Sequence, residues 1–188
     1  DLAGFCVGVV EKERIIDGHT IRSGNQVLGL ASSGPHANGY SLIRAVLEQS
    51  RASLAIKLGD ATLGEALLSP TRIYVPAILA LHEKIEVSAI AHITGGGLPG
   101  NIGRIIPPNL EARIDRCGWE QPLIFQWLEN RGNISSDEML RTFNCGVGLI
   151  LVVEKDDATL ARNILEELGE EVFVIGEIAE GHRGVVID

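Results

Sequence analysis

The chain has 188 residues, of which 45% are hydrophobic and 22 are glycine, and its formal net charge is −9. This apolar fraction supports a packed core and excludes a disordered chain, and the length fits one domain, alone or with a fragment of another. The negative charge argues against nucleic-acid binding and a polybasic membrane patch, because each needs a basic surface. No apolar run approaches the roughly 20 residues that cross a bilayer.

The cysteines and the start of the chain bear on location. Cys6, Cys117 and Cys145 are scattered and form no Cys-x-x-Cys pair, so neither a zinc site nor a disulfide framework is supported. Each cysteine is interpreted as a small core residue. The chain starts at Asp1 and shows no basic leader or signal-type core. A reduced, cytoplasmic location is therefore expected.

In chain order, the first 25 residues lack the alternation of strands and helices that the rest of the sequence predicts. Residues 2–12 predict a strand, and residues 13–25 predict a polar linker with breakers at Asp17-Gly18 and Ser23-Gly24. Beyond them strands and helices alternate, with strands predicted at 26–31, 87–93, 110–114, 145–153, 172–178 and 184–187.

Helix signals fill the intervals between these strands. Helices are predicted at 39–49 and 63–68, from Pro76 to 83, from the triple glycine to 105, from Pro122 to just before Gly132, after a Ser135/Glu138 capping pattern, and from an Asp156 cap to Gly169. Paired helices after Ala31 and after Ile114 break a strict strand–helix alternation. The expected class is therefore α+β, with a mixed central sheet covered by helices.

The loop at residues 31–42, ASSGPHANGYSL, is the strongest candidate for a binding site. A strand, a Gly/Ser turn and a helix N-terminus together make an anion site, because the first helical N–H groups are unpaired. Asn38 is a preferred N-cap type. His36 is expected at the mouth of the site, where the helix end disfavours its cationic form. The alternative is a capped turn without a ligand; the loop has no lysine and is not a Walker A loop.

A second glycine-rich turn, TGGG at residues 94–97, follows the strand at 87–93. Three successive glycines are entropically costly, so we interpret them as backbone that passes close to a ligand or to another chain. Asn101 and Arg104 follow one helical turn apart and either reach the same ligand or lie on the surface. His92 is interpreted as a satisfied core or edge histidine. Two such loops in one domain suggest a phosphorylated ligand.

Residues 32–42 also resemble the SSG(L/P)HSNGYSL signature of the phosphoribosylformylglycinamidine cyclo-ligase family, the aminoimidazole ribonucleotide synthetases. Residues 1–12, 69–74, 91–97 and 141–148 agree with the same family, so the resemblance runs nearly end to end. Two positions depart from it: Ala37 replaces the usual Ser, and Gly100 stands where Glu usually precedes Asn101.

The resemblance implies the C-terminal half of an ATP-dependent cyclo-ligase of purine biosynthesis. In such enzymes ATP phosphorylates the formamide oxygen of formylglycinamidine ribonucleotide, the amidine nitrogen closes the ring, and aminoimidazole ribonucleotide and phosphate leave. Residues 1–24 would be the end of a truncated N-terminal domain plus a linker, and residues 25–188 a C-terminal substrate-binding domain. ATP and Mg²⁺ would be bound mainly by the missing domain. The full-length protein would be a homodimer, and this chain alone would be inactive.

The expected site residues come from the two loops. His36 is the catalytic candidate, expected to bury little surface. The residues expected to bind the phosphoribosyl substrate are Ser32, Ser33, Gly34, Asn38, Gly39, Thr94, Gly95, Gly96, Gly97 and Asn101. No metal ligand is predicted. Two alternative functions stay open: another enzyme of the same ATP-binding superfamily (formylglycinamidine synthetase, thiamine-monophosphate kinase or selenophosphate synthetase), and a non-catalytic phosphate-binding or assembly module.

Overall fold

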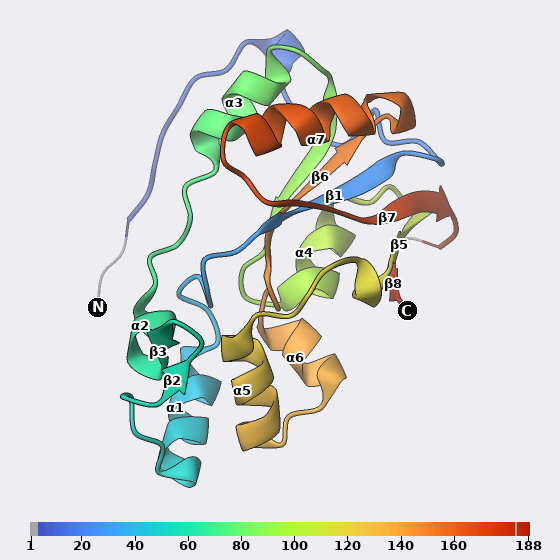
Figure 1. Cartoon of the computed structure of the whole chain (residues 1–188). Helices are drawn as coiled ribbons and strands as arrows, with labels where there is room; N and C mark the ends of the chain where they lie inside the picture. The colour runs from blue at the N-terminus through green and yellow to red at the C-terminus, as the bar shows by residue number, and fades with distance from the viewer. Residues whose placement is uncertain (1–3, 183) are drawn as a thin grey trace.

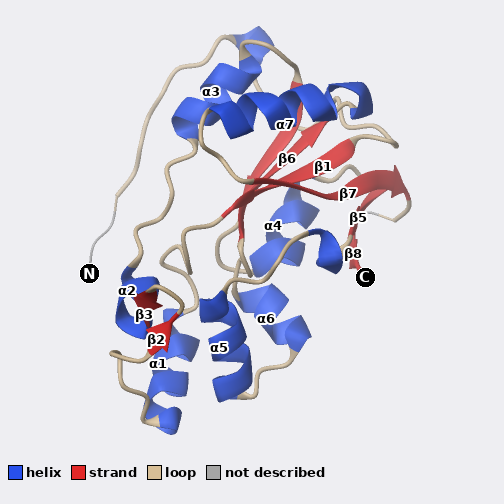
Figure 2. Cartoon of the chain, viewed as in Figure 1, coloured by secondary structure: helices blue, strands red, loops and turns tan. Residues whose placement is uncertain are grey.

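The computed structural model describes residues 4–182 and 184–188 and has a six-stranded mixed sheet at its centre (Figures 1 and 2). The strand order is β4-β6-β1-β7-β5-β8, and every neighbouring pair is antiparallel except β5 and β8. This arrangement confirms the predicted α+β class. The strands are β1 (Gln26–Ala31), β4 (Val87–His92), β5 (Leu110–Ile114), β6 (Val147–Val153), β7 (Val172–Glu180) and β8 (Gly184–Ile187).

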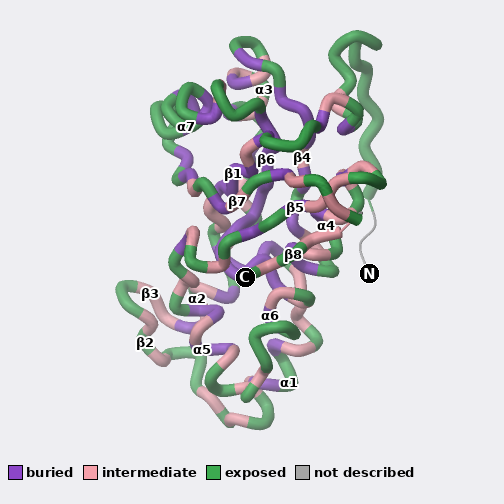
Figure 3. Tube along the Cα trace, turned by 90° about the vertical axis from the view of Figure 1, so that its right-hand side faces the viewer, coloured by how far each residue is buried: buried purple, intermediate pink, exposed green. Residues whose placement is uncertain are grey.

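Helices cover both faces of the sheet, and a further group packs at one end (Figure 1). Helices α3 (Val75–His82) and α7 (Ala158–Glu167) cover one face, and α4 (Gly97–Ile105) covers the other. Every residue of β6 is buried because both of its faces are covered (Figure 3). The end group consists of α1 (Tyr40–Ser50), α2 (Leu63–Leu68), α5 (Leu123–Gly132) and α6 (Ser136–Thr142).

The N-terminal segment departs from the sequence prediction. Leu2 and Ala3 lie outside the described residues, and residues 4–11 form no strand; a short 3₁₀ turn, Lys12–Arg14, follows. Phe5, Val7 and Val9 have the alternation of a strand but are 96%, 86% and 102% exposed. A strand needs a neighbour that accepts its backbone hydrogen bonds, and none of the described strands lies against this segment.

Three helix ends differ from their predicted chemistry. The residue that precedes α1 is Gly39, in the left-handed region, so Asn38 is not the cap. The residue before α7 is Asp157 without a side-chain cap bond, so Asp156 is not the cap either. Helix α5 includes Gly132, and Asn133 takes the left-handed position beyond it. The Ser135 cap is confirmed by a 3.3 Å bond from the Glu138 N–H to its hydroxyl.

One hairpin was not predicted, and two cysteines lie elsewhere than expected. The short hairpin β2 (Lys57–Leu58) and β3 (Ala61–Thr62) precedes a complete capping box at the start of α2, formed by Thr62 and Glu65. Cys145 is buried as expected, but Cys6 and Cys117 are exposed, which corrects their assignment to the core.

Candidate functional site

The two predicted loops meet at one edge of the sheet. Strands β1 and β4 both pair antiparallel with β6, so they run parallel to each other and end on either side of the start of β6. The loop after β1 leads into α1, and the loop after β4 leads into α4. A Cβ placed on Gly95 would lie 3.8 Å from Asn38 Oδ1, so the loops are in contact.

Side-chain donors of the first loop are already used inside the protein. The Ser32 hydroxyl donates to Asn144 Oδ1 at 2.9 Å, and the Ser33 hydroxyl donates to the Pro70 carbonyl at 2.6 Å. The Asn38 amide donates to the His36 carbonyl at 2.6 Å. These bonds fix the shape of the loop and leave mainly backbone N–H groups to face a ligand.

The backbone of the first loop is strained in a way that presents those N–H groups. His36, Ala37 and Gly39 have φ values of 51°, 57° and 74°, and Asn38 between them does not share the positive φ. Left-handed non-glycine residues are costly and persist where the surroundings hold them, and a change of hand along a turn directs successive N–H groups to one side. Among the described residues, the N–H groups of Gly39 and Tyr40 have no backbone acceptor.

The structure corrects the expected placement of His36. Its side chain does not lie at the mouth of the site but is 3% exposed. Its Nε2 atom accepts the Ser33 N–H at 3.0 Å and the Arg72 N–H at 3.4 Å, and the Ser33 hydroxyl lies 3.0 Å from the same nitrogen. The ring centroid lies 6.1 Å from the rings of both Tyr74 and His92. His36 is therefore a buried contact between the loop and its support.

Burial also sets the charge of His36. Desolvation first, and then the positive charges of His92 and Arg72, lower the pKa of His36 from 6.5 to about 4. The imidazole is consequently neutral near pH 7, as expected, but because of burial and not because of the helix end. Desolvation likewise raises the pKa of the neighbouring Tyr74 phenol, whose hydroxyl donates to the Ala31 carbonyl at 2.8 Å.

The glycines of the second loop have three separate explanations. Gly97 has φ 58°, and a Cβ there would lie 1.8 Å from the Leu140 carbonyl oxygen, so the start of α4 packs directly on α6. Gly96 has φ 98° and occupies the N-cap position of α4. Gly95 is exposed and meets only Asn38 Oδ1 within 4 Å. Of the three, Gly95 and Gly96 leave backbone open to a ligand.

Asn101 holds this loop from inside α4. It is 4% exposed, and its amide nitrogen donates to the carbonyls of Gly97 at 2.7 Å, Thr94 at 3.3 Å and Gly95 at 3.5 Å. Its oxygen accepts from the Thr94 hydroxyl at 3.2 Å and from Arg104 Nη1 at 3.1 Å. This geometry favours support of the loop over direct contact with a ligand.

Comparison with known proteins decides the family. The family described as AIR synthase related protein, C-terminal domain, matches residues 22–188. The chain belongs to this family. Its sequence is 57% identical, over 178 residues and 95% of the chain, to the phosphoribosylformylglycinamidine cyclo-ligase of Nitrosococcus oceani, of which it covers 50%. The chain thus spans about half the length of the curated relative that it matches.

Solved structures share the fold of this AIR synthase domain. The thiamine-monophosphate kinase of Stenotrophomonas maltophilia matches at a TM-score of 0.64 with 21% identity, covering 95% of this chain and 54% of that one. E. coli HypE, a hydrogenase maturation protein, matches at 0.62 with 20% identity, covering 90% and 48%. T. maritima PurL complexed with FGAR matches at 0.56 with 17% identity, covering 92% and 27%. At these identities the likeness shows the fold alone.

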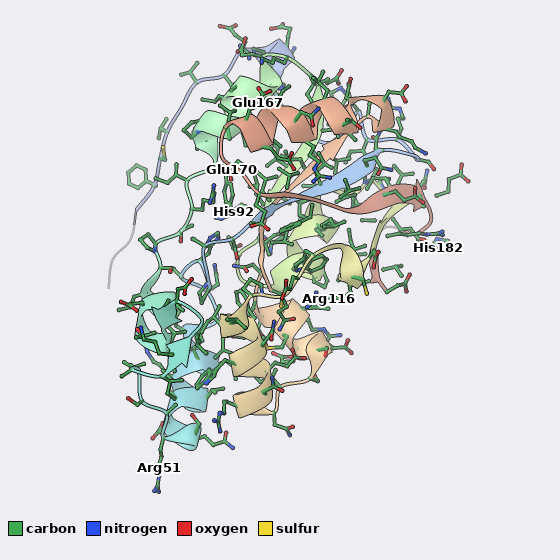
Figure 4. The ribbon with its side chains drawn as sticks, viewed as in Figure 1. Arg51, His92, Arg116, Glu167, Glu170 and His182 are labelled. Atoms are coloured by element: carbon green, nitrogen blue, oxygen red, sulfur yellow. The ribbon has the colours of Figure 1, made fainter. Side chains whose placement is uncertain are left out.

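Three residues of the AIR synthase domain site were not among the expected site residues. His92 ends the edge strand β4 and is exposed, so of its two expected positions the edge is confirmed and the core is wrong; Figure 4 shows it by the strand ends opposite to His182. Arg72 donates to Glu170 Oε2 and to the Gly169 carbonyl, both at 2.7 Å. Asn144 is buried, accepts from Ser32 and the Gly146 N–H at 2.9 Å, and donates to the Gly34 carbonyl at 2.8 Å. Arg72 and Asn144 stood within motifs that carried the resemblance.

An apolar cavity opens beside this edge. It has a volume of about 440 Å³, and Arg72, Tyr74, Leu79 and His92 are among the residues that line it. Among residues 4–182 and 184–188, no three His, Cys, Asp or Glu side chains gather closely enough to hold a metal ion. The helices of that same part include none long and apolar enough to cross a membrane.

Proposed function

We propose that this chain is the C-terminal half of a cytoplasmic, ATP-dependent cyclo-ligase that converts formylglycinamidine ribonucleotide to aminoimidazole ribonucleotide. The observation that carries the reaction is the 57% identity, over 95% of the chain, to a phosphoribosylformylglycinamidine cyclo-ligase. The fold alone does not choose this reaction, because a thiamine-monophosphate kinase has the same fold.

In this proposal the two loops bind the phosphorylated ribose of the substrate through their backbone. The donors are the N–H groups at the start of α1, from Gly39 onward, and those of Gly95 and Gly96 before α4. Two helix N-termini that converge on one edge add partial positive charge there. The side chains of Ser32, Ser33, Asn38 and Asn101 shape the loops, Gly34 and Gly97 allow close packing behind them, and Thr94 supports Asn101.

His92 is an exposed titratable group at the end of β4, on this edge, and Figure 4 shows its side chain among the residues around the strand ends. We assign it, with the Arg72 guanidinium, to contact with the substrate. An imidazole there can donate to, or take a proton from, a group on the ribonucleotide as the ring closes. Because protein groups that are already oriented stabilise developing charge, the rate gain would come from positioning and electrostatics.

ATP and Mg²⁺ belong to the part of the protein that precedes this chain in the proposal. When bound, ATP would supply the phosphoryl group that activates the formamide oxygen. Solved structures with this fold include HypE in complex with ATP. Residues 1–24 are proposed to belong to that preceding domain and its linker, and the full-length protein is proposed to be a homodimer.

Ring-closure assays on the full-length protein test this proposal. Purified protein should form aminoimidazole ribonucleotide from formylglycinamidine ribonucleotide, with one ATP consumed for each product. The chain of 188 residues alone should show no turnover. Phosphorylation of thiamine monophosphate, or amidation of formylglycinamide ribonucleotide, in place of ring closure would reassign the enzyme within the superfamily. Phosphate binding without any turnover by the full-length protein would favour a binding module.

A further inference from the structure

We infer that His36 is a positioning residue, held as the neutral Nδ1–H tautomer so that the lone pair on Nε2 ties the loop after β1 to the segment before α3. The inference rests on the proposed function only in that this loop is the proposed phosphate site. Burial is the first reason, since a side chain that is 3% exposed does not touch a ligand at the surface.

Two backbone amides decide which ring nitrogen carries the proton. The N–H groups of Ser33 and Arg72 lie 3.0 Å and 3.4 Å from His36 Nε2, and a backbone N–H can only donate. Nε2 must therefore offer a lone pair, and a neutral imidazole then carries its proton on Nδ1. The other tautomer would donate from Nε2 to the Ser33 hydroxyl and leave both amides facing a proton.

The other side of the ring is closed by the backbone of β6. His36 Nδ1 is buried and has no hydrogen-bond partner among the described residues. A Cβ on Gly148 would lie 2.6 Å from His36 Cε1, 3.1 Å from Nδ1 and 2.1 Å from the Tyr74 hydroxyl. Gly148 thus leaves the space in which the ring sits. An unpaired buried donor is costly, so the fold accepts a cost to keep Nε2 as the acceptor.

The Arg72 side chain extends the connection to a third segment. It bonds Glu170 and the Gly169 carbonyl in the turn between α7 and β7, while its backbone N–H points at His36. Figure 4 labels Glu170 in this turn, close in the view to His92. His36 consequently joins the first loop to a segment that is itself fixed to the sheet, beside the bond from the Ser33 hydroxyl to the Pro70 carbonyl. Its loss should displace the Gly39 end of the loop and weaken ribonucleotide binding.

Substitutions in the full-length protein separate this role from proton transfer. His36→Gln places an amide oxygen about where Nε2 lies, and that oxygen accepts hydrogen bonds but cannot titrate. His36→Asn is too short to reach there. We expect His36→Gln to keep kcat/KM within about tenfold of the wild type, whereas His36→Asn and His36→Ala lose roughly 10²-fold through misplacement, mainly by a higher KM for the ribonucleotide. The control is His182→Gln, at the distant turn between β7 and β8, with unchanged kinetics.

The same series contains the result that would overturn the inference. If folded His36→Gln is as inactive as His36→Ala, with the loss in kcat, the imidazole takes part in proton transfer or touches the substrate. Hydrogen exchange provides a second reading: the Ser33 and Arg72 amides should exchange faster in His36→Ala than in His36→Gln. Equal protection in both variants would show that Nε2 holds neither amide.

A spectroscopic measurement tests the tautomer without any need for activity. In the full-length protein labelled with ¹⁵N-histidine, the signal missing from His36→Gln should show a protonated Nδ1 and an unprotonated Nε2 at pH 7, with or without ribonucleotide. A proton on Nε2 would contradict the inference. If the Nδ1–H tautomer is found but ribonucleotide does not bind, the structural role of His36 is confirmed and the proposed function is wrong.

Discussion

The two loops that meet at the sheet edge are built in different ways. The loop after β1 is held by side chains: His36 and Asn144 are buried behind it and bond its backbone. The loop after β4 is held mainly by backbone packing, because Gly97 lies directly on the last turn of α6, and Asn101 adds hydrogen bonds to the loop from inside α4. The shape of the first loop therefore depends on the side chains of His36 and Asn144, whereas the shape of the second depends on position 97 having no side chain.

This difference shows where a ligand can be recognised. His36, Asn144, Gly97 and Asn101, which hold the two loops, are buried, and the exposed residues are Ser33 and Ala37 in the first loop and Gly95 and Gly96 in the second. Recognition by backbone N–H groups suits a phosphate, which needs several donors but no particular side chain. Substitutions of the buried supporting residues should thus lower stability, whereas substitutions of the exposed loop residues should lower ligand affinity alone.

The largest effect should come from Gly97→Ala. A Cβ at 1.8 Å from the Leu140 carbonyl oxygen, at φ 58°, forces α4 and α6 apart. We expect a loss of at least about 4 kcal/mol in the free energy of unfolding, or no folded protein. Urea unfolding of the full-length variant measures it. A loss below about 1 kcal/mol would show that the two helices are not in this contact.

Asn144→Ala should come next, as the test of the side-chain-held loop. It removes the acceptor of Ser32 and Gly146 and the donor to Gly34, which leaves buried groups unpaired. A loss of about 3 kcal/mol in unfolding free energy is expected, together with weaker ribonucleotide binding. Exposed Asn163→Ala on α7 is the control and should stay within about 0.5 kcal/mol. If Asn144→Ala and Asn163→Ala have equal stability, Asn144 does not support the loop.

A smaller effect should appear as a pH dependence. The pKa of His36 is lowered from 6.5 to about 4, so the unfolded state binds an extra proton between these values. Stability from the neutral ring is complete above pH 6.5 and is lost as the pH falls toward 4. His36 can add at most about 1.4 kcal/mol per pH unit to this slope. Urea midpoints for wild type and His36→Gln, compared at several pH values, should show a shallower slope in the variant; identical slopes would contradict the buried neutral state.

The smallest effect on stability should be that of Gly95→Ala, the matched partner of Gly97→Ala. Its Cβ meets only Asn38 Oδ1, at 3.8 Å, so the free energy of unfolding should change by less than about 0.5 kcal/mol. Ribonucleotide affinity should nevertheless fall about tenfold, because the methyl group enters the space where a ligand approaches the backbone; titration calorimetry measures it. Unchanged affinity would take Gly95 out of the site.

The sequence predicted the elements well where the pattern is local. The strands predicted at 26–31, 145–153 and 172–178 correspond to β1, β6 and β7, and the helix predicted at 63–68 corresponds to α2. It failed at residues 4–11, whose alternation predicts a strand but whose partner is not among the described strands. It also failed for the Asn38 and Asp156 caps. The Asn38 amide is used for the His36 carbonyl, and one further residue separates each predicted cap from its helix.

The site was predicted as a pair of loops but not in its inner arrangement. Resemblance and glycine content identified residues 32–39 and 94–97, and the structure places them in contact. The burial of His36 depends on Gly148 and on the amide of Arg72, which lie 112 and 36 residues further along the chain. Such long-range contacts leave no periodic signal in a sequence. For His92 the sequence left a core and an edge position open, and only the place of β4 at the edge of the sheet decides between them.

Mapping of backbone amides in the full-length protein tests the central claim most directly. With selective ¹⁵N labelling of glycine and tyrosine, addition of formylglycinamidine ribonucleotide should shift the amides of Gly39, Tyr40, Gly95 and Gly96 first, and inorganic phosphate should shift a subset of them. Gly24, which precedes β1, should not move. Unmoved loop amides at saturating ribonucleotide, in protein that still turns over, would contradict recognition by these two loops.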